Sequence, residues 1–430
     1  MFEYMTQAPI QSNPVRRILA ASLIGTTIEY FDFYIYATAA VLVFPKLFFS
    51  ASDPAMATLE SLATFALAFF ARPLGAALFG HFGDRNGRKA TLVAALMTMG
   101  PSTVAIGLLP GYASIGIAAP ILLAVFRFGQ GLGLGGEWGG AVLLATENAP
   151  PHKKAWYGMF PQLGAPIGFL LSTGSFFILS KTMNESDFIN YGWRIPFIAS
   201  ALLVFVGLYV RLKINETPDF IKIVDNKQRS KMPVKDVFVK HTKAITLGTL
   251  ATVTTFLLFY LMTVFTLSWG TTALNYTKSD FLILQMISML FFGLGIPLSA
   301  WLSDTYGRNK MLVSANIVIM LFGLLFPFIF IANNSFLTGL FLSLGMFLMG
   351  LSYGPIGTAL AGIFPAPVRY TGASLAFTLA GILGASLTPY LATTLAQNYG
   401  LAYVGYYLTL AAGLTLIALL GSRKMMSEEA

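Results

Sequence analysis

Five ionisable side chains interrupt long apolar stretches of this chain, and they are its clearest candidates for chemistry. They are the carboxyl groups of Glu29, Asp32 and Glu137 and the guanidinium groups of Arg72 and Arg127. Burying such a group in an apolar segment costs free energy, so its presence marks a pathway or a binding site. A buried carboxyl exchanges protons as its surroundings change, and a guanidinium binds carboxylates through paired hydrogen bonds. We therefore expect proton exchange and anion binding here.

The spacing of these groups suggests which of them act together. Glu29 and Asp32 are three residues apart and share one face of a helix. With about 1.5 Å per residue, Asp32 and Arg127 each lie about 18 Å from the end of their apolar segments, so they can meet. We predict that Asp32, with Glu29, couples to protons, and that Arg127 contacts Asp32 or a substrate. A static ion pair between two helices is the alternative. Glu137 lies about 15 Å further along, so we assign it, with Trp138, to a gate.

Arg72 lies near the middle of its apolar stretch and is followed by Pro73, which removes a backbone hydrogen bond and bends a helix. Two embedded arginines favour an anionic substrate. Pairing of Arg72 with an acidic side chain is the alternative. Further predicted substrate contacts, although such residues alone are more often packing residues or interface anchors, are Gln130, Tyr36, Tyr260 and Tyr353.

The elements that position these groups follow from the composition. The chain has 430 residues, of which 56% are hydrophobic and 10% charged, and its mean hydropathy is +0.71. Soluble proteins carry about 25% charged residues, so this is an all-α membrane protein rather than a soluble enzyme with a membrane tail. The absence of cysteine excludes disulfides and thiolate chemistry. His81, His152 and His241 lie in polar connectors, so we expect no metal site and no cofactor.

Twelve apolar segments are long enough to cross a membrane as helices. An even number of crossings puts both termini on one side. We predict the spans at 17–44, 58–80, 90–110, 115–146, 156–181, 193–212, 243–269, 280–303, 310–332, 336–363, 370–396 and 400–421.

The positive charges fix the expected orientation, because cytoplasmic connectors are enriched in Lys and Arg. With a cytoplasmic N-terminus, 21 of the 27 basic residues fall in inner connectors, and we count Arg211, at the end of the sixth span, among them. Four lie outside: Lys46, Lys181, Arg194 and Lys278. Both termini are therefore predicted to be cytoplasmic.

An internal repeat predicts two halves. Gly83-Asp84-Arg85-Asn86-Gly87-Arg88-Lys89 recurs as Ser303-Asp304-Thr305-Tyr306-Gly307-Arg308-Asn309-Lys310, with Asp84 and Asp304 half the chain apart. The predicted parts are a tail (1–16), a six-helix bundle (17–213), a cytoplasmic linker (214–242), a second bundle (243–422) and a tail (423–430). The basic linker can also be read as a lipid or nucleic-acid patch, although we expect no nucleic-acid partner.

Several motifs make the chain resemble the major facilitator superfamily, and within it the metabolite:proton symporter family. They are Glu29-Tyr30-Phe31-Asp32-Phe33-Tyr34, Arg72-Pro73-Leu74-Gly75, Gly80-His81-Phe82-Gly83-Asp84-Arg85, Arg127-Phe128-Gly129-Gln130-Gly131, Gly135-Gly136-Glu137-Trp138-Gly139-Gly140, Gly192-Trp193-Arg194-Ile195-Pro196-Phe197, Glu216-Thr217-Pro218-Asp219-Phe220 and Arg369-Tyr370-Thr371-Gly372. Members import citrate, α-ketoglutarate, shikimate, or proline and betaine. The resemblance implies two six-helix bundles and proton-coupled uptake of a small polar metabolite, by a monomer among the lipids of the inner membrane.

The resemblance also implies a cytoplasmic gate. Its predicted members are Asp84, Arg85, Arg88, Glu137, Glu147, Asp304, Arg308 and Arg369. Where family members repeat an acidic residue in the tenth span, this chain has Gly362-Ile363-Phe364-Pro365 and then Pro367. We therefore expect Arg308 to lack its usual carboxylate and the gate to be asymmetric.

Three functions remain open from the sequence. The favoured one is proton-coupled uptake of an organic acid by alternating access. The second is an efflux antiporter or a uniporter on the same fold. The third, a membrane enzyme or receptor, is disfavoured because no nucleophile–base pair or metal cluster is evident. The glycine run from Gly129 to Gly140 resembles a phosphate loop but lacks the strand before it and the Lys-Ser/Thr after it, so we interpret it as helix packing.

Overall fold

The computed structural model describes residues 14–49, 54–213, 215–225, 230–330 and 334–427, which form helices and no strands. Most of the predicted N-terminal tail (1–13), the last three residues (428–430), and Lys227 and Arg229 of the linker lie outside these ranges. The all-α prediction is confirmed for the described chain.

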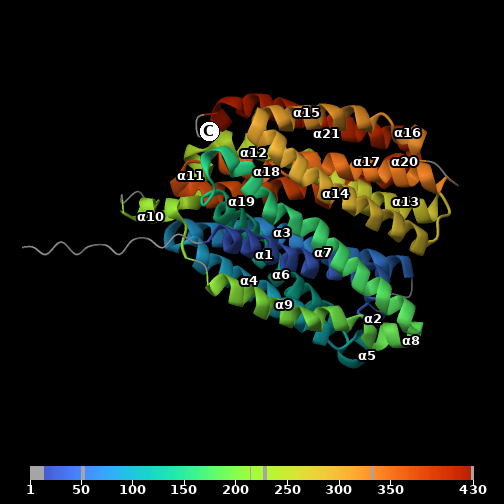
Figure 1. The fold of residues 1–430 in the computed structure, drawn as a ribbon. Coiled ribbons are helices and arrows are strands. Elements are labelled where there is room, and N and C mark those ends of the chain that lie inside the picture. The colour runs from blue at the N-terminus through green and yellow to red at the C-terminus, as the bar shows by residue number, and fades with distance from the viewer. Residues whose placement is uncertain (1–13, 50–53, 214, 226–229, 331–333, 428–430) are drawn as a thin grey trace, which may run out of the picture.

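The first half of the chain contributes six long helices, drawn in blue to green in Figure 1. Short helices α2 (Phe44–Leu47), α5 (Tyr112–Ile115) and α8 (Glu185–Asp187) connect them at one end. The long helices are α1 (Val15–Leu42), α3 (Pro54–Asn86), α4 (Arg88–Leu108), α6 (Ala118–Thr146), α7 (Lys154–Thr182) and α9 (Arg194–Leu212).

The second half repeats this arrangement with more interruptions. The continuous helices are α12 (Thr242–Tyr260), α14 (Lys278–Tyr306), α15 (Arg308–Gly323), α17 (Ser335–Tyr353), α19 (Arg369–Gly381) and α21 (Leu401–Ser427). Wider turns, η3 (Leu261–Phe265) and η5 (Ile382–Ser386), link α12 to α13 (Thr266–Thr272) and α19 to α20 (Thr388–Tyr399). Pro355, which has no backbone N–H, follows the end of α17 and precedes α18 (Ile356–Ala361).

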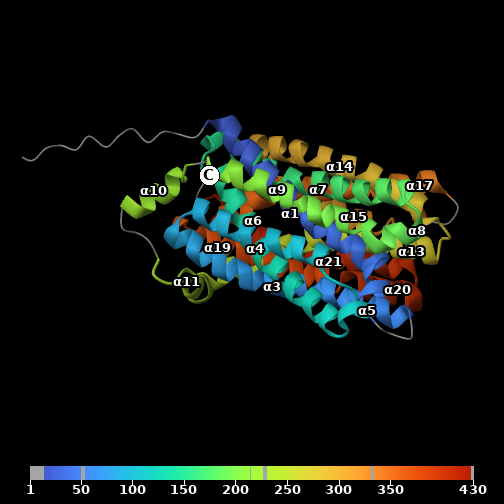
Figure 2. The same cartoon turned by 90° about the horizontal axis from the view of Figure 1, so that it is seen from below.

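The two halves lie side by side, with the second half above the first in Figure 1. Helix α7 packs along α14, and α3 packs along α19, so these pairs form the seam. The linker helices α10 (Pro218–Asp225) and α11 (Pro233–Lys240) lie at one end of the bundle in both views (Figures 1 and 2). We call this end the linker face and the opposite end, with α2, α5 and α8, the far face.

Eleven helical stretches of the described chain are long and apolar enough to cross a membrane. The predicted span 310–332 corresponds to α15, a helix of 16 residues, followed by a break and α16 (Phe326–Ile329). Helix α15 packs along α21 and α17 and so completes the second six-helix bundle. At 1.5 Å per residue it is about 24 Å long, shorter than the other spans.

Glycines allow α3 and α6 to touch along their backbones. A Cβ built on Gly75 falls 2.0 Å from the carbonyl oxygen of Leu132, and one built on Gly135 falls 2.0 Å from that of Arg72. No side chain fits such gaps. The glycine run of α6 is therefore a packing surface, as predicted, and it fixes the position of Arg72 relative to α6.

Candidate functional site

A narrow cavity lies where the two halves meet, near the middle of the long helices. Both halves contribute to its wall, which is mostly aromatic and carries one charged group, Arg72. Of the predicted substrate contacts, Arg72, Tyr260 and Tyr353 line it. The complete lining is Tyr30, Phe33, Tyr34, Arg72, Ala165, Thr255, Phe256, Phe259, Tyr260, Phe292, Met349 and Tyr353.

The guanidinium of Arg72 rests on aromatic rings. Its central carbon lies 4.4 Å from the ring centre of Phe33 and 4.9 Å from that of Phe69. Arg72 is 7% exposed, and no hydrogen bond or ion pair reaches it from the described chain. Aromatic faces stabilise the charge but leave its five N–H donors unused. The cavity therefore holds a buried cation ready to bind an anion.

The cavity is closed toward the linker face by contacts between the halves. The hydroxyls of Tyr30 and Tyr353 are 2.5 Å apart. Closer to the linker face, the side-chain amide of Gln162 donates to the carbonyl oxygen of Tyr353 and accepts a hydrogen bond from the indole N–H of Trp138. The ring of Trp138 stacks on Phe377 of the other half at 3.6 Å. These contacts separate the cavity from the linker face.

Asp32 and Arg127 line a second, smaller void beside the cavity, together with Phe33, Met99, Gln130 and Leu134. Asp32 accepts a 2.6 Å hydrogen bond from Ser200 through Oδ1, and its Oδ2 is buried without a partner. Asp32 and Arg127 thus lie at the same void, as their equal depth along the two helices predicted. Within the described residues, however, no ion pair joins them.

Arg127 is held by the two predicted substrate contacts that do not line the cavity. Its Nη1 donates to Oε1 of Gln130 at 3.0 Å, and Gln130 donates to Thr103. The guanidinium carbon lies 4.0 Å from the ring centre of Tyr36, whose hydroxyl donates to Thr64. Gln130 and Tyr36 therefore surround Arg127, while its Nε and Nη2 stay buried without partners.

Glu137 forms a buried ion pair that the sequence analysis missed. Its partner is Arg211 of α9, whose Nη1 also donates to the carbonyl oxygen of Leu92 at 2.8 Å. The count of connector charges included Arg211, but Arg211 is only 4% exposed and belongs to the helix. A long side chain in the last turn of an apolar helix can point back along it, and this position was the available signal.

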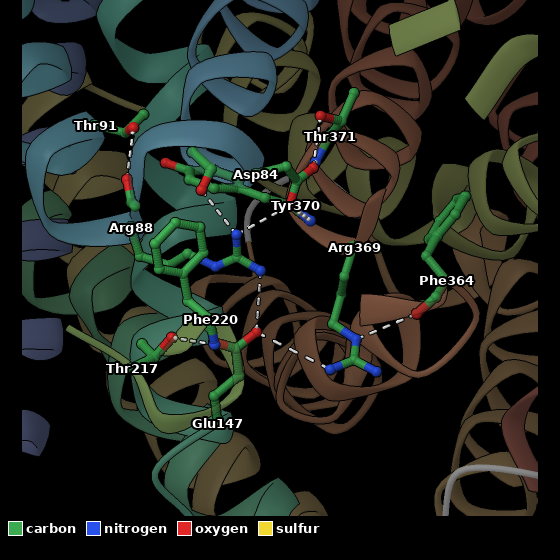
Figure 3. Close-up of polar contacts among 12 residues, drawn as sticks. Asp84, Arg88, Thr91, Glu147, Thr217, Phe220, Phe364, Arg369, Tyr370 and Thr371 are labelled. Carbon is green, nitrogen blue, oxygen red and sulfur yellow. Dashed lines mark hydrogen bonds and ion pairs between the residues drawn. The ribbon is translucent and has the colours of Figure 1, made fainter. Parts of the chain in front are cut away.

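A second charge cluster lies at the linker face, around Arg88 (Figure 3). Arg88 Nη1 lies 3.0 Å from Asp84 Oδ1, and Nη2 lies 3.4 Å from Glu147 Oε1. All three side chains are almost fully buried. Arg369, from the other half, lies 4.0 Å from the same oxygen of Glu147. The structure thus brings together four of the residues assigned to the gate.

Asp84 also joins the two halves. Its carboxylate accepts the backbone N–H groups of Tyr370 and Thr371 at 3.2 and 3.0 Å, and the Thr371 hydroxyl at 2.8 Å. These N–H groups begin α19, where a helix has unpaired donors and a positive dipole end. The Tyr370 hydroxyl reaches the carbonyl oxygen of Gly136. The start of α19 is thereby held against α3 and α6.

Asp304 makes the equivalent contact on the other side of the seam. Its two oxygens accept the backbone N–H groups of Ala155 and Trp156, at 2.9 and 2.8 Å, at the start of α7. Arg308 donates to the carbonyl oxygen of Thr358. Arg85 lies beside His81 at the exposed end of α3.

Glu216, in the linker, is a further member of the charge cluster around Arg88, and the site prediction omitted it. Its carboxylate accepts the backbone N–H groups of Arg88 and Lys89, at 3.0 and 3.3 Å, at the start of α4. The ring of Phe220 lies 5.3 Å from the Arg88 guanidinium carbon. Both residues belong to a motif quoted for the family resemblance, and that was the only signal.

Comparison with known proteins gives consistent relatives. Residues 18–246 match the family model described as "Sugar (and other) transporter". The chain is 55% identical to the inner membrane metabolite transport protein YhjE of Escherichia coli, covering 96% of this chain and 94% of that protein. It is 34% identical to the Escherichia coli shikimate transporter (94% and 93%) and 33% identical to the Salmonella typhimurium proline/betaine transporter (95% and 83%).

Among solved structures, the proton:xylose symporter XylE bound to 6-bromo-6-deoxy-D-glucose superimposes with a TM-score of 0.76. The match covers 96% of each chain at 15% identity, so it supports the fold and nothing finer.

Proposed function

Because this chain belongs to the major facilitator superfamily, in its family of sugar and other transporters, we propose that it imports a small carboxylate metabolite together with a proton. It is a multi-pass membrane protein and a transporter of small molecules, not an enzyme. The family leaves open the charge of the substrate and the driving force of transport, and the side chains of the site bear on both.

The unpaired guanidinium of Arg72 in the central cavity is the observation that carries this proposal. No hydrogen bond or ion pair occupies the N–H donors of Arg72 among the described residues, although Glu29 acts on its charge, so these donors are available, and a carboxylate matches their fork geometry. The cavity lies between the two halves, where a carrier must bind its substrate to expose it to each side in turn. We assign the substrate carboxylate to Arg72 rather than to Arg127, because Arg127 faces the second void.

A charge count supports coupling to protons. Glu137 and Arg211 neutralise each other, which leaves Glu29 and Asp32 opposite Arg72 and Arg127 inside the first half. Binding a monocarboxylate at Arg72 adds one negative charge to this buried group. Uptake of one proton by Asp32 or Glu29 restores neutrality, so loading of the two ligands is cooperative and reciprocal. One proton per carboxylate is the expected stoichiometry.

We propose that the linker face is cytoplasmic, since most Lys and Arg of the connectors lie there. The contacts from Tyr30–Tyr353 down to Asp84 close this face, so the structure corresponds to a state closed to the cytoplasm. We further propose a monomer in the inner membrane, where YhjE is named as residing.

The aromatic lining favours a second candidate substrate, a betaine. Eight of the residues that line the cavity have aromatic side chains, and aromatic faces bind quaternary ammonium groups well. A betaine would place its carboxylate on Arg72 and its cation among the rings. The substrates for which two relatives are named differ in the same way, because shikimate has no cationic group whereas proline and betaine have one.

Reconstituted protein in liposomes tests the proposal. Shikimate, α-ketoglutarate, proline and glycine betaine are first screened by the thermal stabilisation each gives to the purified protein. The stabilising compound is then supplied outside liposomes that are alkaline inside. Accumulation above the external concentration, abolished by a protonophore, is expected. Equilibration that ignores the pH gradient would indicate a uniporter, and substrate-driven proton movement in the opposite direction would indicate an antiporter.

The contacts of Asp84 predict a gate phenotype. Asp84→Asn weakens one ion pair and the acceptors for three hydrogen bonds across the seam, at a cost of about 2 kcal/mol, which shifts the balance between states roughly thirtyfold. We expect a thiol introduced at Ser374, which is on α19 and faces Gly139 of α6, to react faster in this background and transport to fall about tenfold.

Asp280→Asn is the matched control, because the Asp280 carboxylate accepts a hydrogen bond from the Thr277 hydroxyl at the start of α14, on the far face. It should change neither labelling nor transport. Unchanged labelling and transport in Asp84→Asn would show that this cluster does not hold the linker face closed.

A further inference from the structure

The buried acids and arginines of the first half form three levels between the far face and the linker face. Each level holds one acid and one arginine. From the far face to the linker face the levels are Asp32 with Arg127, Glu29 with Arg72, and Glu137 with Arg211, of which the last forms an ion pair. Counted along their helices from the linker-face ends, the acids lie about 26, 21 and 14 Å deep. Arg72 lies at the depth of Glu29, about 21 Å. A carboxyl therefore follows roughly every helical turn or two.

The lowest level touches α1 one turn away from Glu29. A Cβ built on Gly25 falls 2.7 Å from Arg211 Nη2 and 3.4 Å from Glu137 Oε1. Gly25 and Glu29 are four residues apart, so they lie on the same face of α1. A methyl group at this position would displace the end of the Arg211 side chain. Arg211 therefore contacts α1 about one helical turn from the backbone of Glu29, on the linker-face side.

Glu29 and Glu137 both have spare capacity for a proton or a donor. Glu29 is 2% exposed and its Oε2 is buried without a partner. Glu137 is fully buried, and while Oε1 pairs with Arg211, its Oε2 is also without a partner. An ion pair kept only for packing would be expected to have its remaining oxygen satisfied.

The charged groups that act on Glu29 come from two sides. Arg72, on α3, faces it from the cavity, and Arg211, on α9, faces it from the linker face. The remaining titratable groups near it are phenols: Tyr30 and Tyr34 on its own helix, Tyr353 at the end of α17 and Tyr370 on α19. A substrate carboxylate that engages Arg72 competes with Glu29 for that cation, which favours a protonated Glu29 while substrate is bound. Once substrate has left and Glu29 ionises, Arg211 is the second cation that can stabilise it.

We propose that Arg211 alternates between Glu137 and Glu29 and so passes the transported proton to the linker face. This step rests on the proposed proton-coupled function. While substrate is bound, Glu29 carries the proton and Arg211 pairs with Glu137. As substrate leaves, the guanidinium moves one turn to Glu29. The O–H bond at Glu29 breaks, a proton passes to Glu137, now unpaired, and Glu137 releases it to water on the linker side. One proton and one substrate anion leave together, so the net charge of the group, with Arg72 included, is the same before and after the step.

Arg211 is thus a positioning residue, and Glu137 is the release site. Glu137→Gln leaves Arg211 with Glu29 as its only acid partner and removes the acceptor. Proton release should then fail while substrate can still exchange. Gly25→Ala should act similarly, because the new methyl group occupies the place of the guanidinium.

The test uses the full-length protein in liposomes that contain a pH-sensitive dye, with the substrate identified by the stabilisation screen. In the unsubstituted protein, added substrate should acidify the lumen. Glu137→Gln should reduce that proton signal at least tenfold and keep half or more of the substrate counterflow. In the Glu29→Gln background, Glu137→Gln should have no additional effect on the proton signal. Lys213→Gln, an exposed cation at the end of α9, is the control and should behave like the unsubstituted protein.

Each outcome is decisive. A full proton signal in Glu137→Gln overturns the relay. Loss of counterflow in Glu137→Gln and also in Arg211→Lys, which retains the charge, identifies a packing ion pair and likewise overturns it. Absence of any substrate-driven proton signal in the unsubstituted protein contradicts the proposed function itself, which separates the two failures.

Discussion

Replacing Arg72 with lysine will reduce substrate uptake at least a hundredfold. Lysine keeps the positive charge but loses the planar fork that binds both carboxylate oxygens, and its compact ammonium is harder to desolvate between Phe33 and Phe69. Losing one buried charged contact costs about 3 kcal/mol or more, which corresponds to a factor of roughly 150 in affinity. Initial uptake rates and thermal stabilisation by substrate measure the loss.

Arg85→Lys provides the matched control, because Arg85 lies on the same helix but at its exposed end. It should retain substrate stabilisation in full. If Arg72→Lys binds substrate within a factor of three of the unsubstituted protein, the carboxylate does not bind at Arg72. Arg127, with two unpaired nitrogens, then becomes the alternative anion site.

Asp32→Asn will abolish accumulation driven by a pH gradient and preserve exchange. Asparagine resembles the protonated acid and can still accept the hydrogen bond from Ser200, so the fold and the cavity should persist. Without a titrating group at this position the substrate can cross, but the proton gradient can no longer drive it uphill. The final ratio of internal to external substrate should drop from above ten to about one, while counterflow remains.

The control for Asp32→Asn is Asp187→Asn in α8 on the far face, where the acid is half-buried and accepts a hydrogen bond from Asn184. Continued accumulation with an unchanged pH profile in Asp32→Asn would eliminate Asp32 as the coupling site and leave Glu29. Arg127→Lys should also lose uptake, since the stacking of Arg127 on Tyr36 and its bond to Gln130 require a planar guanidinium.

The sequence predicts depth along a helix well. Asp32 and Arg127 lie in different helices nearly a hundred residues apart, yet they line the same void, because the rise per residue in a helix is constant. The repeat of Asp84 and Asp304 likewise predicts two equivalent loops at one face. Each acid then accepts the N–H groups that begin a helix of the other half.

Side-chain direction was not predictable in the same way. Arg211 was counted as a connector charge because it lies one residue from the end of its helix, although its side chain turns inward to Glu137. Gln130 and Tyr36 were predicted as substrate contacts, and in the structure they contact Arg127 rather than line the central cavity: Gln130 from the next turn of the same helix and Tyr36 from α1. The direction of a side chain depends on how the helices pack. When a helix is apolar on all sides, the periodicity of its hydrophobic residues does not show which face points inward.

The interruptions in the second half were also missed. The spans 336–363 and 370–396 were each predicted as one helix, but the first breaks after Tyr353 and the second widens at η5. Pro355 accounts for the first break, whereas the wider turns at η3 and η5 have no counterpart in the hydropathy pattern.

The stacking of Trp138 on Phe377 gives the protein a built-in optical reporter. Of the five tryptophans, Trp138 is the one whose ring is stacked on the opposite half within the described chain, and it is 2% exposed. Parting of the halves at the linker face must separate these rings and admit water to the indole, which shifts its emission to longer wavelength. A stopped-flow fluorometer can therefore follow the opening of this face during turnover without any attached dye. Phe377→Leu should blunt the change, and the signal would give the rate of the conformational step separately from the rate of substrate release.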